Sequence, residues 1–441
     1  MSTSAPENQS PLTATPGDLL EVTVGPVAHG GHCVARLDGR VIFVRHALPG
    51  EKVVVKITDA SRKARFWRGD AVEILERSPE RVPSAWKKAG PGGVGGAELS
   101  HVSLAGQRDW KAQVIKEQLA HLAKLDLDIV VEAAPGDEEN GGLGWRTRFD
   151  VIADDQGRMG MRGFRSHEIF PLHEMPLASP AALELAEQEK VFTGRWTPGV
   201  SIEVVAPANG TPGLVLQDGE PQRKGFVDPR PNARRNVTET VTVDGKEYEY
   251  RVAAAGFWQV HREAPTLLAQ TVLDFAKSGD FDLTDATVVD LFSGAGLFSV
   301  PLADAVGVVG RVISIEGDER ACKDARRNLH NYEQAEVHQG QVDKILADND
   351  HGAMAGADIV VLDPPRAGAG EKTVNQIVNL DPAKVIYVAC DPAALARDIG
   401  YFQGHGYKVE EIKAFDLFPM THHVECVALL VKSDQDESVA V

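Results

Sequence analysis

Three residues with reactive side chains lie at the ends of short apolar runs in the C-terminal third of the chain. Asp363 and Cys390 each follow such a run, and Glu425 precedes one. A cysteine thiolate can add to an electrophilic carbon, and a carboxylate whose pKa is raised by burial can remove a proton. Taken alone, Cys390 could be a small core residue and Glu425 could pair with His422 or His423. Together the three residues predict a nucleophile, a base and a polar contact in one crevice.

Prolines restrict the backbone beside two of these residues. Asp363 is followed by Pro364, Pro365 and Arg366, a sequence that would present the carboxylate on a rigid turn. Pro392 suits the first turn of a helix, whose N-terminus would stabilise a thiolate at Cys390. Asp391 would oppose that effect if its carboxylate pointed inward.

A glycine-containing loop upstream predicts a nucleotide-type cofactor site. Gly294 and Gly296 follow the apolar run that ends at Phe292, and glycines there let the backbone approach a ligand closely. Glu316 ends the next run and can accept hydrogen bonds from ribose hydroxyls. A G-x-G loop with a following acid also fits NAD(P), but Ser299 stands where the third glycine would be, and Asp-Pro-Pro has no role in hydride transfer.

From Thr287 onward, short apolar strands alternate with helical segments. The expected strands are 287–292, 311–315, 358–362 and 384–389, and the expected helices include 319–330 and 392–404. This alternation predicts a doubly wound, Rossmann-like α/β domain whose ligands bind at the carboxyl ends of the strands.

The N-terminal part of the chain predicts a small β-barrel, because about five short strands and tight turns fit into residues 18–75. Its motifs resemble those of a TRAM domain, a small RNA-binding barrel: Gly30-Gly31-x-x-Val34-Ala35-Arg36, Asp38-Gly39-Arg40-Val41-x-Phe43-Val44 and Ala47-Leu48-Pro49-Gly50-Glu51. Phe66 and Trp67 lie between Arg65 and Arg68, which favours RNA as the partner.

The C-terminal part resembles the catalytic domain of the RNA uracil-5-methyltransferases. The motifs that carry this resemblance are Phe257-Trp-Gln259-Val, Asp290-Leu-Phe-Ser-Gly-Ala-Gly, Glu316-Gly, Asp363-Pro-Pro-Arg366, Tyr387-Val-Ala-Cys390-Asp-Pro-Ala-Ala-Leu-Ala-Arg397-Asp398 and Phe418-Pro-x-Thr-x-His423-x-Glu425. The resemblance implies a class I methyltransferase fold and S-adenosyl-L-methionine as the methyl donor. It implies that Cys390 is the nucleophile and Glu425 the base, and that the cofactor contacts are Gln259, Phe292, Glu316, Gln341 and Asp363.

The implied reaction is methylation of uracil C5 in structured RNA through a covalent bond between Cys390 and uracil C6. We expect 23S rRNA as the substrate, with tRNA as the alternative. A uracil inside a helix must be extruded to reach the thiol, so a loop or bulge is favoured.

Two departures from the family pattern bear on the site. Cys390 is followed by aspartate where the family usually has asparagine. The cysteines that bind an iron–sulfur cluster in many rRNA-modifying members are replaced by Lys88, Val94, Ala97 and Met175. We therefore expect no cluster and no metal.

We predict five segments along the chain. Residues 1–15 form a disordered tail, 16–76 the barrel, 77–255 a central α+β domain with a helix near 107–125, 256–433 the methyltransferase domain and 434–441 a second tail.

Composition limits the classes of protein. The 441 residues carry a net charge of −18, which argues against bulk attraction to nucleic acid, so local basic stretches must supply any grip on phosphates. Four dispersed cysteines exclude a zinc ribbon. No apolar run reaches 18 residues, so we expect no membrane span, and the N-terminus has no basic start or apolar stretch, so we expect no secretory signal there. We expect a cytoplasmic protein with no obligate protein partner.

Three other functions share part of this pattern. A cytosine-5 RNA methyltransferase uses the same thiolate addition but usually places its nucleophile in a Thr-Cys dipeptide. A radical methylthiotransferase needs a cysteine cluster that is absent. A non-catalytic RNA-binding protein on the same scaffold would not need Gln259, Asp363, Cys390 and Glu425 together.

Overall fold

The computed structural model describes residues 13–60, 65–223, 226–228, 230, 233–279, 281–348, 354 and 356–433. The predicted tails therefore lie outside the described residues, apart from 13–15. By its contacts the chain divides into two compact units, one running to Gln107 and including Met420–His422, the other comprising Arg108–Pro419 and the residues from His423 on. The predicted boundaries at residues 76 and 255 divide the chain more finely and stay a prediction.

The first unit contains the predicted closed barrel, in which the strands pair in the order β1-β2-β3-β5-β4. These strands are β1 (Leu19–Ala28), β2 (His32–Leu37), β3 (Arg40–Arg45), β4 (Lys52–Asp59) and β5 (Phe66–Glu76). Alternate residues such as Val53, Val55 and Ile57 are buried in the barrel, as the period-two pattern requires. The barrel prediction is confirmed.

The four positions where cluster-binding relatives carry cysteines hold three apolar residues and one lysine in this chain. Val94 and Ala97 are buried, Lys88 is exposed, and Met175 of the second unit is buried as well. In the part of the chain that the structure describes, no three His, Cys, Asp or Glu side chains are grouped to hold a metal ion.

Residues 420–422 are hydrogen-bonded within the same unit. The Met420 carbonyl accepts from the Leu99 N–H at 2.8 Å, the Met420 N–H donates to Gln107 Oε1 at 2.6 Å, and the His422 N–H donates to Glu98 Oε1 at 3.0 Å. Three backbone groups of a loop far along the sequence are thereby satisfied.

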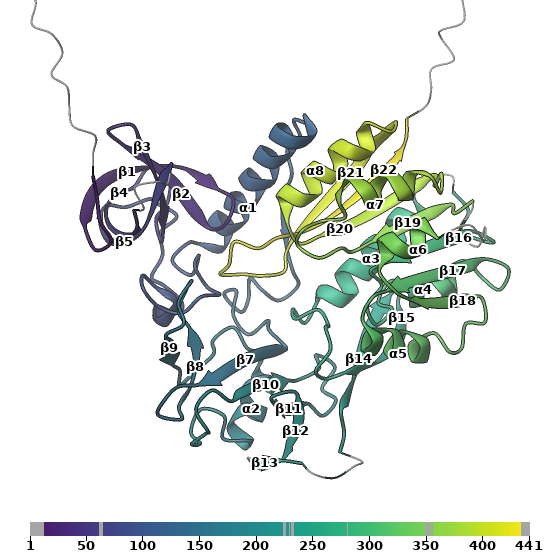
Figure 1. Ribbon diagram of the computed structural model, residues 1–441, viewed down its shortest axis with the longest axis horizontal. Helices are drawn as coiled ribbons and strands as arrows, with labels where there is room; N and C mark the ends of the chain where they lie inside the picture. Colours follow the sequence, from purple (N-terminus) through teal and green to yellow (C-terminus); the bar gives the residue numbers. More distant parts are fainter. Residues whose placement is uncertain are drawn as a thin grey trace, which may run out of the picture. The chain divides into compact units, whose positions relative to one another are not determined.

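The second unit is built on an eight-stranded sheet in the order β18-β17-β16-β19-β20-β22-β21-β6 (Figure 1). The strands are β6 (Val131–Ala133), β16 (Thr287–Leu291), β17 (Arg311–Glu316), β18 (Ala335–Gln339), β19 (Ile359–Leu362), β20 (Lys384–Ala389), β21 (Tyr407–Asp416) and β22 (Glu425–Lys432). The strands β18, β17, β16, β19 and β20 run parallel to one another. Only β22 runs antiparallel to both of its neighbours, β20 and β21. The predicted doubly wound sheet is confirmed, and its strand order reverses between β16 and β19.

Helices cover both faces of this sheet. One face carries α3 (Ala264–Lys277), α4 (Ser299–Ala305) and α5 (Glu319–Asn328); the other carries α6 (Val342–Ala347), α7 (Gly370–Val378), α8 (Pro392–Gln403) and part of α1 (Leu104–Gln118), which continues as a short π-helix over Leu119–Ala123. Adjacent strand residues such as Val288 and Val289 enter opposite cores, so the strands are apolar throughout.

A mixed region lies between α1 and α3 in the sequence. A seven-stranded sheet has the order β13-β12-β11-β10-β7-β8-β9, and β14 pairs with β15 in a hairpin. The elements are β7 (Arg148–Ala153), β8 (Met159–Arg162), β9 (Ile169–Pro171), α2 (Pro180–Gln188), β10 (Ser201–Val205), β11 (Leu214–Gln217), β12 (Glu220–Arg223), β13 (Phe226–Val227), β14 (Asn236–Val243) and β15 (Lys246–Ala253). Its α+β character is as predicted. However, β6, which falls within the predicted central domain, pairs with β21 in the eight-stranded sheet. No described helix is both long and apolar enough to cross a membrane.

A buried ion pair fixes the end of β21 in the second unit. Lys111 Nζ lies 2.5 Å from Asp416 Oδ1, both side chains are buried, and Nζ also donates to the Phe418 carbonyl at 3.1 Å. Asp416 is the last residue of the strand, so this pair anchors the start of the loop that leads to Glu425.

We predict that Lys111→Met lowers the free energy of unfolding by about 3–5 kcal/mol, because it leaves the Asp416 carboxylate buried without a counter-charge. Urea unfolding of the variant and the native protein measures the difference. The double variant Lys111→Met/Asp416→Leu should recover much of the loss, because it removes both charges. Equal stability of the single variant and the native protein would contradict the role of the pair.

Candidate active site

The strand register places the sequence-predicted residues at one edge of the sheet. Leu291 of β16 is level with Leu362 of β19, so the next residues, Phe292 and Asp363, continue side by side beyond the paired strands. On β20, Ala389 is level with Cys426 of β22. Because β22 runs antiparallel to β20, the residue before Cys426 faces the residue after Ala389. This register juxtaposes Cys390 and Glu425, which are 35 positions apart in the sequence.

The glycine loop has a backbone that few side chains tolerate. Phe292, Gly294 and Gly296 have φ values of +62°, +55° and +90°. The left-handed conformation is routine for glycine and costly for phenylalanine, so Phe292 stores strain at the point where the chain leaves β16. A Cβ atom on Gly294 would meet nothing within 4 Å, which leaves open space over this part of the loop. The loop thus has the open backbone that a cofactor cradle requires.

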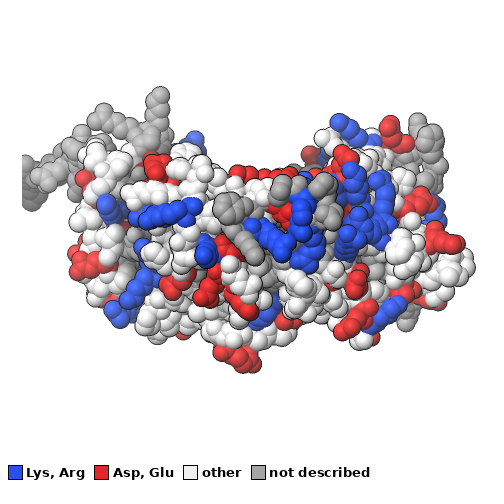
Figure 2. All heavy atoms as spheres, turned by 90° about the horizontal axis from the view of Figure 1, so that it is seen from below, with Lys and Arg blue, Asp and Glu red and all other residues white. Residues whose placement is uncertain are grey.

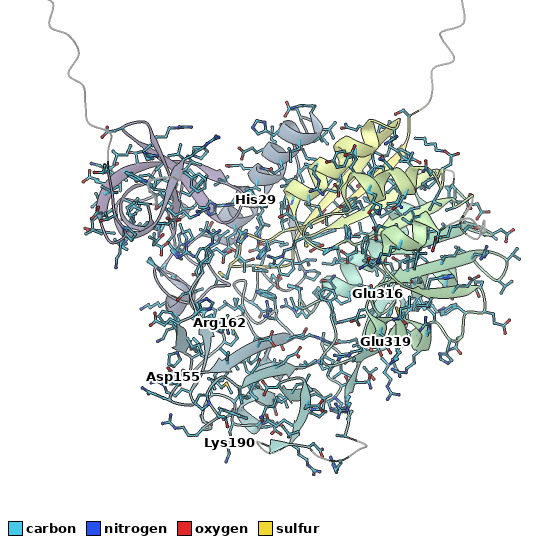
Figure 3. All side chains as sticks on the ribbon, in the orientation of Figure 1. His29, Asp155, Arg162, Lys190, Glu316 and Glu319 are labelled. Atoms are coloured by element: carbon cyan, nitrogen blue, oxygen red, sulfur yellow. The ribbon has the colours of Figure 1, made fainter. Side chains whose placement is uncertain are left out.

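Glu316 connects the glycine loop to the end of β17. Its carboxylate accepts hydrogen bonds from the N–H groups of Gly294 at 2.9 Å and Asp318 at 2.7 Å. Figure 3 shows Glu316 at the end of β17, close to Glu319 at the start of α5. Each carboxylate oxygen has a second lone pair, so ribose hydroxyls can still be accepted there.

Hydrogen bonds connect the segments of Gln341 and Gln259 to Glu316 and to the glycine loop, respectively. The Gly340 N–H donates to the Glu316 carbonyl at 2.8 Å, so Gln341 follows directly; its side chain is exposed and makes no cap hydrogen bond to α6. Gln259 is buried next to Trp258, whose ring packs on that of Tyr250. The Tyr250 hydroxyl donates to the Leu297 carbonyl at 2.9 Å, which ties the Gln259 segment to the glycine loop.

The thiol of Cys390 is half-buried, and its pKa is raised to about 12. Burial is the largest cause, followed by the charges of Glu425 and Asp363, while Arg366 acts in the opposite direction. Burial outweighs the expected stabilisation of the thiolate by α8, and Asp391 caps the N-terminus of that helix. Its carboxylate accepts from the N–H groups of Ala393 at 3.0 Å and Ala394 at 2.9 Å.

Three carboxyl groups crowd the same edge. Glu425 is 3% exposed, and burial raises its pKa well above the ordinary value, with a further contribution from Asp363. Burial and the charge of Asp290 raise the pKa of Asp363 to about 7. Asp290 is itself fully buried with a pKa raised to about 7, and its Oδ1 atom has no hydrogen-bond partner among the described residues. Such a site favours a positively charged ligand.

A hydrogen-bond network holds the turn that follows Asp363. Asp398 of α8 accepts at Oδ2 from the N–H groups of Ala369 at 2.7 Å and Gly370 at 3.2 Å, and from the Tyr387 hydroxyl at 2.7 Å. Arg397 donates to the other oxygen of Asp398. Arg397 and Asp398 belong to the sequence motif around Cys390, which by itself does not predict this role.

Phe257 begins the Phe-Trp-Gln motif but is not among the predicted site residues. Its side chain is 77% exposed, whereas the neighbouring Trp258 is buried. The backbone before it is held firmly: Arg148 donates to the Gly256 carbonyl at 2.9 Å, and Arg320 donates to the Ala255 carbonyl at 3.0 Å. The exposure of this ring, two residues from Gln259, indicates a residue that could contact a ligand. The sequence pattern alone does not show which of the two aromatic residues is exposed.

Comparison with known proteins identifies both parts of the chain. A family model for tRNA (uracil-5-)-methyltransferases matches residues 232–433, and a TRAM-domain model matches residues 13–72. An uncharacterized RNA methyltransferase of Bifidobacterium longum is 43% identical over 420 residues, covering 93% of this chain and 96% of the relative. One from Streptomyces avermitilis is 42% identical over 448 residues, covering 94% and 98%.

A solved structure shows the same fold. The chain is similar to the Pyrococcus abyssi tRNA (uracil-54, C5)-methyltransferase in complex with S-adenosyl-L-homocysteine, with a TM-score of 0.69 and 22% identity. The match covers 93% of this chain and 100% of the other.

We predict that Glu425→Gln raises Tm by a few degrees at pH 8, and that the gain disappears near pH 5. The folded protein holds a proton on Glu425 more tightly than the unfolded chain does, so the associated stability is present at low pH and is lost as pH rises. The exposed Glu411→Gln serves as the control and should show no such trend. Melting curves at both pH values measure it, and a gain that did not depend on pH would contradict the buried-carboxylate interpretation.

Proposed function

Because the chain belongs to the uracil-5 family of S-adenosylmethionine-dependent RNA methyltransferases, we propose that it methylates C5 of a uracil in structured RNA through a covalent Cys390 adduct. Glu425 is the base that removes the C5 proton. The observation that carries this proposal is the juxtaposition of Cys390 and Glu425 across β20 and β22, beside Asp363.

The residues around the glycine loop suit the methyl donor. In this assignment Gln259, Phe292, Gly294, Gly296, Glu316, Gln341 and Asp363 hold S-adenosyl-L-methionine, which supplies an electrophilic methyl group on a sulfonium. Its positive charge matches the crowded carboxylates of Asp290 and Asp363, and would lower the pKa of the nearby thiol.

The proposed reaction proceeds by addition and elimination. Uracil C5 is a weak nucleophile, so the Cys390 thiol first loses its proton to solvent, which the positive charge of the bound methyl donor favours. The thiolate then adds to C6, and the C5–C6 π electrons move onto the O4 carbonyl as an enolate. The enolate carbon C5 attacks the sulfonium methyl and forms the new C–C bond, leaving a neutral thioether. The Glu425 carboxylate then takes the C5 proton, the C5–C6 double bond re-forms and the thiolate leaves C6.

The barrel provides aromatic and cationic side chains suited to RNA. Phe43 and Phe66 pack edge to face at 5.0 Å, and the Arg68 guanidinium lies 4.7 Å from the Phe66 ring centre. The Trp67 ring is buried, and the Arg40 guanidinium lies 5.1 Å from its centre. The partly exposed Phe66 ring can stack on an unpaired base while Arg68 neutralises a phosphate, which supports RNA as the substrate.

The proposed mechanism predicts different behaviour for the two catalytic residues. Cys390→Ala should abolish methyl transfer and still bind RNA. Glu425→Gln should form the methylated adduct but release it slowly, because the C5 proton has no acceptor. A protein–RNA species that survives denaturing electrophoresis, with radioactivity from labelled methyl donor, detects this adduct.

Substrate choice is measured in the same assay. Native protein is incubated with 23S rRNA, bulk tRNA, and oligomers that contain uracil or cytosine as the only pyrimidine. We expect 5-methyluridine in the 23S rRNA; label in tRNA would select the alternative RNA, and label in cytosine alone would support the cytosine-5 reaction. Normal turnover by Cys390→Ala would remove the thiol from the mechanism.

We also propose that the exposed Phe257 ring stacks on a base next to the target uridine. Replacement by alanine should raise KM for structured RNA by about ten- to a hundredfold, since a base–aromatic stack contributes about 1–3 kcal/mol. Phe257→Tyr keeps the ring and should retain most of the affinity. The exposed Phe164→Ala is a matched control. If KM for Phe257→Ala equalled that of the control, the stacking role would be ruled out.

A further inference from the structure

A basic surface lies on α5 and the adjoining strands, outside the barrel and the candidate active site. It is formed by exposed side chains that carry positive charge: Arg235, Arg251, Arg320, Lys323, Arg326 and Arg327. We call it the α5 basic surface. Figure 2 shows Lys and Arg side chains gathered on this face of the molecule, to the right of its centre. The whole chain has a net charge of −18, so a surface rich in positive charge is unlike the chain as a whole.

Hydrogen bonds to the backbone join the parts of this surface. The Ala254 N–H donates to the Arg235 carbonyl at 2.9 Å, and the Arg320 side chain donates to the carbonyl of the next residue, Ala255. Along β15, the Arg251 N–H donates to Asn328 Oδ1 at 3.0 Å, and the Ala253 N–H donates to Asp324 Oδ2 at 2.7 Å. The helix is therefore fastened along the strand, and its cations lie on a fixed support.

The positive charge of the surface is only partly neutralised. Lys323 pairs with Glu319, Arg327 with Asp324, and Arg235 with Glu220. By contrast, Arg320 donates to the Ala255 carbonyl and Arg326 to the Val337 carbonyl at 3.2 Å. A carbonyl is neutral, so these contacts orient the guanidinium groups without cancelling their charge.

The surface begins at the rim of the candidate active site. Arg320 holds Ala255, two residues before the exposed Phe257 and four before Gln259. Five of the six cations are arginines, whose planar fork binds phosphate oxygens in pairs. A polyanion that entered the crevice beside Phe257 would therefore meet oriented guanidinium groups along α5.

We propose that the α5 basic surface binds the phosphate backbone of the RNA that flanks the target uridine. It is a second RNA-binding surface, in addition to the barrel. This inference rests on the proposed function, because it assigns the polyanion to the RNA substrate. Its effect is on the affinity for long RNA and not on the chemistry, since none of these side chains is placed at the reacting atoms.

The test removes three charges without leaving a buried carboxylate unpaired. The variant Arg251→Gln/Lys323→Gln/Arg326→Gln is compared with Lys344→Gln/Lys372→Gln/Lys408→Gln, in which three exposed lysines elsewhere are neutralised. KM and kcat are measured on the RNA that the native protein methylates, at several salt concentrations, together with Tm. We expect KM to rise at least fivefold with kcat unchanged, and the slope of log affinity against log salt to fall by about 2–3, as about 0.9 per lost phosphate contact predicts.

The outcomes separate this inference from the proposed function. If the native protein forms no 5-methyluridine, the proposed function fails. If it does, and the α5 variant matches the control variant in KM and in salt slope, the inference is overturned. The surface would then not bind RNA, whatever other acidic partner it binds. If Tm falls in the α5 variant, the single variants Arg251→Gln and Arg326→Gln are measured, and each should reduce the slope by about one.

Discussion

Three buried carboxyl groups at one edge of a parallel sheet are the constraint on which the rest of the site depends. Asp290, Asp363 and Glu425 come from three different strand ends, and burial raises the pKa of each. Like charges so close cannot all be ionised at neutral pH without a cation. Arg366 supplies one such charge, and a sulfonium donor would supply another. The arrangement therefore favours a cation over a further negative charge at this edge of the sheet.

The strand pattern and the cofactor loop could be predicted from the sequence because both depend on local composition. Apolar runs of four to six residues between helical segments specify buried parallel strands, and Gly294 and Gly296 mark a backbone that only glycine adopts easily. The left-handed conformation of Phe292 could not be predicted, because an aromatic residue adopts it only when the surrounding structure compensates for the strain.

Other features depended on contacts that are distant in sequence. Cys390 and Glu425 face each other only because β22 inserts between β20 and β21, an order that local patterning does not determine. The three residues of β6 were too few for a period to appear. The role of Asp391 depended on its side-chain direction: its carboxylate caps α8 by accepting from the N–H groups of Ala393 and Ala394.

The burial of Cys390 has a consequence for the durability of the enzyme. Peroxides and disulfides attack the thiolate form of cysteine, so a thiol that stays protonated is oxidised slowly. With its pKa raised to about 12, the Cys390 sulfur is in that unreactive form. Burial is the largest cause, the charges of Glu425 and Asp363 add to it, and Asp391 contributes least. The surroundings of Cys390 thus keep its thiol in the form that oxidants attack slowly.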